Sequence, residues 1–302
     1  VAERFFNVLA AQDGVEFAEA EQKALERQLE QTQQRFEVGL IAITDVQEAQ
    51  AGYDLAVAEA IRARNELDSA REALREVTGE YHAGLSPLGP EMPLVTPAPE
   101  NMDAWTETAL AQNLRIRQAL AETEVAEQEI RRQQAGHIPT VDIVGTHGWR
   151  RQGGQFGAAS INQTTLGIEV NVPLYQGGQV VSRTREARHR HMASLERLEE
   201  ERRAAERQTR DAYLGVLAGI SRVKALRQAV VSSETAREAT VAGFEVGTRT
   251  SVDVVTAERN LFRAKRDYAR SRYDYILNSL RLKLAAGTLA PEDLAEVSDW
   301  LE

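Results

Sequence analysis

The sequence predicts a mainly α-helical protein with a small β part, in which one long antiparallel coiled-coil helical hairpin is built twice. Three observations predict this class. The chain matches itself without gaps at an offset of 208 residues, which indicates two structural repeats. Apolar and small side chains recur at spacings of three and four over long stretches, and one short region alternates with a period of two instead.

Composition excludes several classes of protein. The 302 residues carry a net charge of −10, which argues against nucleic acid as a partner and against a polybasic membrane patch. Because the chain has no cysteine, it has no disulfide and no thiolate metal site. It contains no run of ~18 or more apolar residues, so no transmembrane helix is expected. It opens on Val1 in a helical pattern without an initiator methionine, so we expect a fragment or a processed product.

The two copies of the repeat cover residues 1–79 and 209–287. RFEVGLIAITDV at 35–46 matches GFEVGTRTSVDV at 243–254, with the Val-Gly pair and the following aspartate in the same register. An upstream portion, roughly 102–208, precedes the second copy and has no counterpart before the first. We therefore expect the first repeat to be truncated at its N-terminus.

Prolines limit where the helices can run. Since an internal proline costs a helix ~3 kcal/mol or more, the eight prolines leave 1–86, 100–138 and 174–290 as permitted helical stretches. In the first stretch we expect a helix from Asp45 to Thr78, with alanine at many positions of a coiled-coil seam. In the third, the helical pattern continues from about Gly178 to Ala242. Alanine-rich seams allow helices to approach one another closely.

The matched glycines, Gly39 and Gly247, mark the tips of the two hairpins. Glycine tolerates the left-handed conformation that closes a helix C-terminus, so the chain is expected to reverse at both positions. The candidates for capping the return helices are Thr44 or Asp45 in the first copy and Ser251 or Asp253 in the second.

Residues 138–174 differ in kind from the rest of the chain. IPTVDIVGTHGWR (138–150) and TTLGIEVNVPLY (164–175) alternate in polarity, which predicts two antiparallel strands of about ten residues. RQGGQFGAASINQ (151–163) between them predicts a glycine-rich polar loop. One face is aliphatic, the other is polar and Trp149 lies near one end, as in a strand of a transmembrane β-barrel. A hairpin packed on a soluble helical domain fits the same residues.

Several motifs in the same order resemble one known family. The two tips at 35–46 and 243–254, VPLYQGGQV (172–180), EVTG (76–79) and LAAGTL (284–289) are similar to the TolC family of outer-membrane efflux channels. The likeness runs the length of the chain, although the first barrel hairpin of the family and its preceding helix are absent. The resemblance implies a homotrimer in which each protomer gives four strands to one β-barrel in the outer-membrane lipid of a Gram-negative bacterium. Below the barrel, the paired helices form an α-barrel tunnel that projects into the periplasm.

On this template the chain divides into six segments, with an equatorial belt near the middle of the tunnel. They are the tunnel hairpin of repeat 1 (1–78), an equatorial segment (79–101), a tunnel helix of repeat 2 (102–137), the outer-membrane hairpin (138–174), the tunnel hairpin of repeat 2 (175–286) and a C-terminal equatorial segment (287–302).

The resemblance implies passive conduction of drugs or secreted proteins from the periplasmic side to the outside, without enzymatic chemistry or a cofactor. In the family the channel docks with a periplasmic adaptor protein and an inner-membrane transporter of the RND or ABC type. A soluble coiled-coil scaffold or a periplasmic adaptor is the alternative, which explains the heptads but leaves the amphipathic strands unexplained. Glu186 and His189 have the spacing of half a carboxylate-bridged metal site, but no second copy of the motif exists.

The resemblance also assigns candidate site residues. A closed-state latch would pair Asp45 with Arg249 between neighbouring protomers, together with Gln28 and with Phe244, where family members can carry tyrosine. Asp253 would form a carboxylate ring at the aperture, and Thr256 stands where a second ring would lie, so we expect weaker cation selectivity. The adaptor-docking residues would be Arg35, Val38, Gly39, Leu40, Val246, Gly247 and Thr248. The lipid-facing strand residues would be Leu166, Ile168, Val170, Val172 and Trp149.

Overall fold

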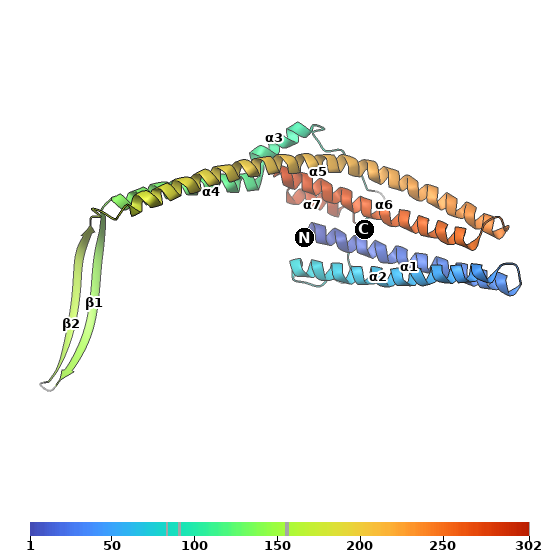
Figure 1. Cartoon of the computed structure of the whole chain (residues 1–302), viewed down its shortest axis with the longest axis horizontal. Coiled ribbons are helices and arrows are strands. Elements are labelled where there is room, and N and C mark those ends of the chain that lie inside the picture. The colour runs from blue at the N-terminus through green and yellow to red at the C-terminus, as the bar shows by residue number, and fades with distance from the viewer. Residues whose placement is uncertain (83, 90–91, 155–156, 302) are drawn as a thin grey trace. The chain divides into compact units, whose positions relative to one another are not determined.

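The computed structural model describes residues 1–82, 84–89, 92–154 and 157–301 (Figure 1). Its elements are α1 (Ala2–Glu37), α2 (Ile43–Thr78), α3 (Met102–Gln112), α4 (Leu114–Gln134), the 3₁₀ helix η1 (Ala135–His137), β1 (Thr140–Gly154), β2 (Gly157–Asn171), α5 (Gln179–Glu245), α6 (Ser251–Ala286) and α7 (Pro291–Ser298). They form two compact units, one from the residues before 114 and after 204, the other from Leu114–Ala204. Among the helices of the described chain, none is long and apolar enough to cross a membrane.

The sequence repeat is a structural repeat. Helices α1 and α5 end at Glu37 and Glu245, and the return helices α2 and α6 are both 36 residues long. All their matched ends obey the offset found in the sequence. Gly79 and Gly287, which follow the return helices, both adopt the left-handed conformation, with φ of 78° and 76°. The mainly α fold with two copies of one hairpin is therefore confirmed.

The two tips have the same backbone. Gly39 and Gly247 have φ of 75° and 78°, and the next amide N–H reaches back to the last turn: Leu40 to the Arg35 oxygen at 2.9 Å, Thr248 to the Gly243 oxygen at 2.8 Å. This is the hydrogen bond of a Schellman motif, for which glycine has the required φ. The prediction that a glycine closes each tip is confirmed.

The predicted capping residues were wrong. The N-cap of α2 is Ala42 and that of α6 is Thr250, so both aspartates occupy the third helical position. From there, the carboxylate of Asp45 accepts the Ala42 N–H at 3.3 Å and that of Asp253 accepts the Thr250 N–H at 2.9 Å. An acid at the third position can bond the N-cap amide behind it, which is why a cap residue and its partner are easily exchanged in a sequence reading.

Helices α1 and α2 pack antiparallel through small residues (Figure 1). The buried positions of α2 include Ala49, Gly52, Ala56, Ala60 and Ala63. A Cβ added to Gly52 would lie 3.0 Å from Cγ1 of Val255, so α6 also approaches α2 closely at this point. The alanine seam thus allows three helices to share one narrow core.

The widest core lies where the segment after α2 and the C-terminal segment meet α6. Phe6, Trp105, Tyr275, Ile276 and Leu280 are among its buried residues. The Val95 N–H donates to the Tyr275 hydroxyl at 2.8 Å, and the hydroxyl donates to the Val95 oxygen at 3.0 Å. Residues 79–101 contain no helix in their described part and pair with the chain end through a single bridge, Leu88 to Leu301. Positions 83, 90, 91 and 302 of the two predicted equatorial segments lie outside the described residues.

The predicted single helix over 102–137 is interrupted. It consists of α3 and α4, separated by Asn113, and then η1. Asn113 is buried, and its side-chain N–H donates to the Ala285 oxygen near the end of α6 at 2.8 Å. Its backbone leaves the helical region, with ψ of 126°. No proline or glycine marks this break, so the sequence pattern predicted one continuous helix here.

The two strands pair in one antiparallel register over 15 positions, from Thr140 with Asn171 to Gly154 with Gly157. The predicted loop at 151–163 is therefore mostly strand, because backbone pairing needs no particular side chain and continues through this polar stretch. Residues 155 and 156 of that loop lie outside the described residues.

Candidate functional site at the hairpin tips

Both tips present exposed aliphatic side chains beside their glycine. Val38 and Leu40 at the first tip are 70% and 72% exposed, and Val246 at the second is 75% exposed. Gly39, Gly247 and Thr248 are exposed as well. Of the seven predicted docking residues, six therefore form two accessible surfaces with an apolar knob on each. The seventh, Arg35, is directed toward the other tip.

Arg35 extends from the first tip to the second. Its Nη1 donates to the Phe244 oxygen at 2.9 Å and its Nη2 to the Glu245 oxygen at 3.3 Å. Its guanidinium carbon lies 4.5 Å from the centroid of the buried Phe244 ring. The two carbonyl groups belong to the last turn of α5, where they have no partner within the helix and where a cation is favoured by the helix dipole. Arg35 therefore caps α5 from the outside.

The second tip replaces this arginine by Gly243, the position that matches Arg35 in the repeat. A Cβ on Gly243 would lie 2.7 Å from Cγ of Arg249 and 3.2 Å from Oγ1 of Thr248. The Gly243 oxygen accepts the amide N–H groups of both residues, at 2.8 Å from Thr248 and 3.2 Å from Arg249. The absence of a side chain at Gly243 thus leaves room for the aliphatic part of the Arg249 side chain. The Gly243 oxygen also holds the backbone of Arg249, the predicted latch residue, in place.

The predicted aperture residue Asp253 is held in a full capping box. Besides the Thr250 amide, its Oδ2 accepts the Thr250 hydroxyl at 3.0 Å, and its own N–H donates to the Thr250 hydroxyl at 3.3 Å. The Thr250 backbone N–H, followed by its hydroxyl, lowers the pKa of the Asp253 carboxyl below its usual 3.8. Thr256, one turn later, is exposed and uncharged. This tip therefore carries one fixed carboxylate per chain.

The four predicted latch residues differ in their exposure and in their contacts. In the described part of the chain, no ion pair joins Asp45 to Arg249, and Arg249 is exposed. Gln28 is buried inside the protomer, where its Nε2 donates to the Thr32 hydroxyl at 3.4 Å. Phe244 is covered by Arg35 and has no hydroxyl to donate. Within one chain the structure brings together Phe244 and Arg35, which were predicted for different roles.

A cavity of about 410 Å³ lies between the two tips. Gln31, Gln34 and Val38 line it from α1 and its cap, and Val241 and Phe244 line it from α5. Its wall is partly apolar, and Arg35, which binds the Phe244 oxygen, also lines it. Across residues 1–82, 84–89, 92–154 and 157–301, no cluster of three or more histidine or acidic side chains could hold a metal ion.

The strand pair has one aliphatic face. Because paired residues of an antiparallel sheet lie on the same face, Val141 with Val170, Ile143 with Ile168, and Gly145 with Leu166 form one exposed surface. Trp149 lies on that face opposite Asn162, and Val172 follows the last pair. The opposite face begins with Thr140 opposite Asn171 and continues with Asp142 opposite Glu169.

Comparison with known proteins decides the family. The model of the family described as outer membrane efflux protein matches residues 1–80 and 105–288. The chain belongs to this family. It is 38% identical over 311 residues to outer membrane protein TolC of Escherichia coli K12, which covers 99% of this chain and 63% of TolC. It is 30% identical over 301 residues to the alkaline protease secretion protein AprF of Pseudomonas aeruginosa, again over 99% of this chain and 63% of AprF.

Solved structures agree on the fold of this chain. The outer membrane channel CmeC of Campylobacter jejuni superposes with a TM-score of 0.75 over 99% of this chain and 65% of CmeC, at 13% identity. At that identity the likeness concerns the fold alone. The chain spans less than two thirds of the length of each of these three proteins. The family that this chain belongs to is one of outer-membrane proteins.

Sequence reasoning missed two features of the hairpin tips. It took Arg35 for a docking residue because it flanks the Val-Gly motif, and it assigned nothing to Gly243. The signal was present in the repeat, since Arg35 against Gly243 is the one mismatch in the first five positions of the two tips. A mismatch at the end of a helix can mark a position where two copies contact each other.

Proposed function

We propose that the protein is the exit duct of a tripartite efflux pump or of a type I secretion system. It works as a homotrimer in the outer membrane and passively conducts drugs or proteins from the periplasmic side to the outside. The observation that carries the proposal is the aliphatic face of the strand pair, which is exposed along the paired register while the opposite face carries a pair of acids near its start. In a soluble helical scaffold, this exposed aliphatic face would lie unfavourably in water.

The dimensions of the hairpin suit a bilayer. From Val141 to Trp149 the strand rises roughly 26 Å at ~3.3 Å per residue, close to the apolar band of about 25 Å that outer-membrane strands present between aromatic girdles. Within this band His147 and Thr164 lie opposite each other, and their side chains form a hydrogen bond of 2.8 Å. Internal pairing lowers the cost of placing these polar groups against lipid. Each protomer then contributes its hairpin to a shared barrel.

The tips are proposed to dock a periplasmic adaptor protein, which links the duct to an inner-membrane transporter of the RND or ABC type. The exposed Val38, Leu40 and Val246 offer apolar knobs. The glycines beside them let a partner backbone approach, and the cavity between the tips can receive a side chain of an adaptor hairpin. The relationship to AprF supports protein export as one cargo class, and the relationship to TolC supports the efflux role.

The closed state is proposed to depend on pairs between protomers. Because Asp45 and Arg249 form no ion pair with each other inside the described chain, each is available to a neighbouring copy. An exposed pair contributes only ~0–1 kcal/mol, so three copies give a bias that partner contact can reverse. Three Asp253 carboxylates around the axis would attract cations at the entrance.

Purification and conductance test this proposal. The protein should require detergent, should migrate as a trimer that dissociates on heating, and should carry current in planar bilayers. A water-soluble monomer without current would contradict it and would favour a coiled-coil scaffold or adaptor. For the docking tips, Gly247→Ala should weaken crosslinking to the adaptor and reduce drug resistance, whereas Gly14→Ala in the body of α1 should leave both unchanged. Unaltered crosslinking in both variants would show that the tips do not dock.

A further inference from the structure

The first three turns of α5 carry a cluster of positive charge. Arg183, Arg185, Arg188 and Arg190 are exposed, and the single acid among them, Glu186, pairs with Arg190 at 2.5 Å. Within the described ranges, the other three arginines form no ion pair. We name Arg183, Arg185 and Arg188 the arginine collar. At ~1.5 Å per residue, all three lie within about 14 Å of the start of the helix.

The neighbouring helix does not neutralise the collar. Two acids near the end of α4 are already paired with arginines of the same helix, Glu127 with Arg131 at 3.1 Å and Glu129 with Arg132 at 2.6 Å. The net charge of −10 argued against a basic membrane patch. That argument fails locally, because the net charge of a long chain averages over charges that are segregated along it. The collar is a local concentration of positive charge around the start of α5 on a negative protein, with Arg185 and Arg188 toward one side of the helix and Arg183 toward the other.

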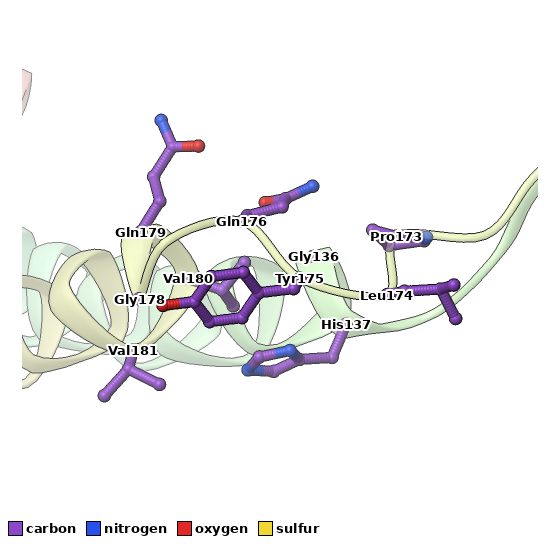
Figure 2. Close-up of a pocket in the computed structure, with 10 residues that line it drawn as sticks. All are labelled: Gly136, His137, Pro173, Leu174, Tyr175, Gln176, Gly178, Gln179, Val180 and Val181. Atoms are coloured by element: carbon purple, nitrogen blue, oxygen red, sulfur yellow. The ribbon is translucent and has the colours of Figure 1, made fainter.

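The collar lies directly after the foot of the strand hairpin. Beyond Asn171 the chain continues through Val172 and Pro173 to Leu174 and Tyr175, which are 92% and 88% exposed. Figure 2 shows the Tyr175 ring directed back toward the first turn of α5, beside the ring of His137. Gly177 and Gly178, with φ of 61° and 81°, then turn the chain into α5.

The order along the chain is therefore aliphatic, aromatic, basic. Lipid-facing strands present an apolar band that ends in an aromatic girdle at the membrane–water boundary. Beyond the girdle lie the phosphate groups, and anionic lipids there attract clusters of arginine. A guanidinium group matches the geometry of a phosphate through two parallel hydrogen bonds. The three chemical layers of the hairpin foot follow the three layers of a leaflet.

We propose that the arginine collar binds the phosphate groups of anionic lipids in the leaflet at the foot of the hairpin. This rests on the proposed function, in which the hairpin lies in the membrane. The bound lipids surround the top of the helical part and hold it against the bilayer. Neighbouring copies of the chain are the competing source of negative charge for these arginines, and the experiment separates the two.

Lipid binding can be measured on the trimer in neutral detergent by native mass spectrometry, with phosphatidylglycerol and phosphatidylcholine as probes. The wild-type protein should retain phosphatidylglycerol in preference by at least about tenfold, because three cations act together. The triple variant Arg183→Gln, Arg185→Gln, Arg188→Gln should bind both lipids alike. The preference of the wild type should also fall as salt rises from ~0.05 to ~0.5 M.

Helix α5 supplies a matched control. Arg222, Lys224 and Arg227 are exposed, have the same spacing as the collar and carry the same charge. Their triple glutamine variant should keep the wild-type preference. If both triple variants lose it equally, the effect is general electrostatics and the proposal is overturned. It is also overturned if the collar variant keeps the preference for phosphatidylglycerol. A third contrary result is that millimolar inorganic phosphate displaces bound phosphatidylglycerol as effectively as added phosphatidylglycerol does.

Three further outcomes separate the causes. If the collar variant dissociates the trimer in phosphatidylcholine as readily as in phosphatidylglycerol, the arginines serve a protein interface and not lipid. If the wild-type protein conducts in phosphatidylcholine bilayers but shows no lipid preference, the collar proposal fails while the duct stands. A wild-type protein that neither inserts nor conducts in any bilayer contradicts the proposed function itself.

Discussion

Arg35 covers the ring of Phe244, with its guanidinium carbon 4.5 Å from the ring centroid, and donates to the carbonyl oxygen of the same residue at 2.9 Å. The first hairpin tip of the chain is thereby attached to the second. The contact breaks the symmetry of the repeat, since the matching position of the second tip is Gly243. A family tyrosine at position 244 would offer a hydroxyl, whereas this chain offers an aromatic face under a cation.

Arg35→Ala should loosen the second tip. It removes two hydrogen bonds to the end of α5 and a cation over an aromatic ring, together about 1–2 kcal/mol for a half-buried group. Amide hydrogen exchange at residues 244–248 should accelerate roughly 5- to 30-fold, since 1.4 kcal/mol is a factor of ten. Arg27→Ala is the control, because Arg27 lies on the same helix and its side chain donates to the Lys23 oxygen of that helix. Equal exchange in both variants would show that Arg35 does not hold the tip.

Two glycine substitutions should have opposite effects on stability. Gly247 has φ of 78°, and forcing a Cβ into this region costs about 1–2 kcal/mol, so Gly247→Ala should lower the free energy of unfolding. Gly14 lies in the helical interior of α1, where an added Cβ meets no atom within 4 Å. Gly14→Ala should raise the free energy of unfolding by roughly 0.5–1 kcal/mol. Urea unfolding checks both, and a shift in the same direction for the two would refute the assignment of strain to the tip.

How far the sequence leads can be judged from particular residues. The repeat placed both tips and the paired ends of four helices, because a match without gaps constrains every element at once. The tip glycines were predicted because a φ near +75° admits few other residues. The strand face was predicted from alternation alone. In each case, a local rule acts on the residue itself and leaves a mark in the sequence.

The features that were missed depend on contacts between distant residues. Asn113 breaks a helix through a bond to Ala285, and nothing local marks it as a helix terminus. The contact of Arg35 with Phe244 was not predicted, because its partner lies in the other repeat. The strands extend beyond the predicted ten residues because backbone pairing continues through polar side chains. Tertiary contacts decided the first two, and backbone pairing within the hairpin decided the third.

Asp13 should make stability depend on pH. Burial raises the pKa of its carboxyl above the usual 3.8, against the hydrogen bond of 2.8 Å from the Tyr273 hydroxyl; nearby Glu16 raises it further and Arg272 lowers it. A raised pKa means that the folded state binds more protons, so this contribution is complete below the unfolded pKa and is lost as pH rises through the folded one.

Asp13→Asn keeps an acceptor for Tyr273 and removes the charge. Its urea midpoint should therefore exceed that of the wild type at roughly pH 8 and depend less on pH between there and pH 4. Tyr273→Phe removes the donor that favours the carboxylate and should steepen the dependence. A wild-type midpoint that is flat over this range, or one that rises with pH through Asp13, would contradict the prediction.

Thr256→Asp should increase the cation preference of the channel. It adds a second carboxylate one turn after Asp253, and rings of carboxylates attract cations at a narrow entrance. Reversal potentials across a salt gradient in planar bilayers measure the preference. Thr256→Asn, which adds similar volume without charge, should behave as the wild type, and Asp253→Asn should reduce the preference. Identical reversal potentials for the aspartate and asparagine variants would show that these positions do not line the aperture.

Exchanging the charges of the latch tests whether Asp45 and Arg249 meet between protomers. Asp45→Arg or Arg249→Asp alone places like charges together and should raise the current of the closed channel, by roughly a hundredfold at most for three pairs of ~0–1 kcal/mol each. The double exchange restores opposite charges and should return the current toward that of the wild type. Asp45→Arg also removes the carboxylate that accepts the Ala42 N–H, so Asp45→Asn, which retains an acceptor, separates lost capping from lost pairing. If the double exchange leaks as much as either single variant, these two residues are not partners.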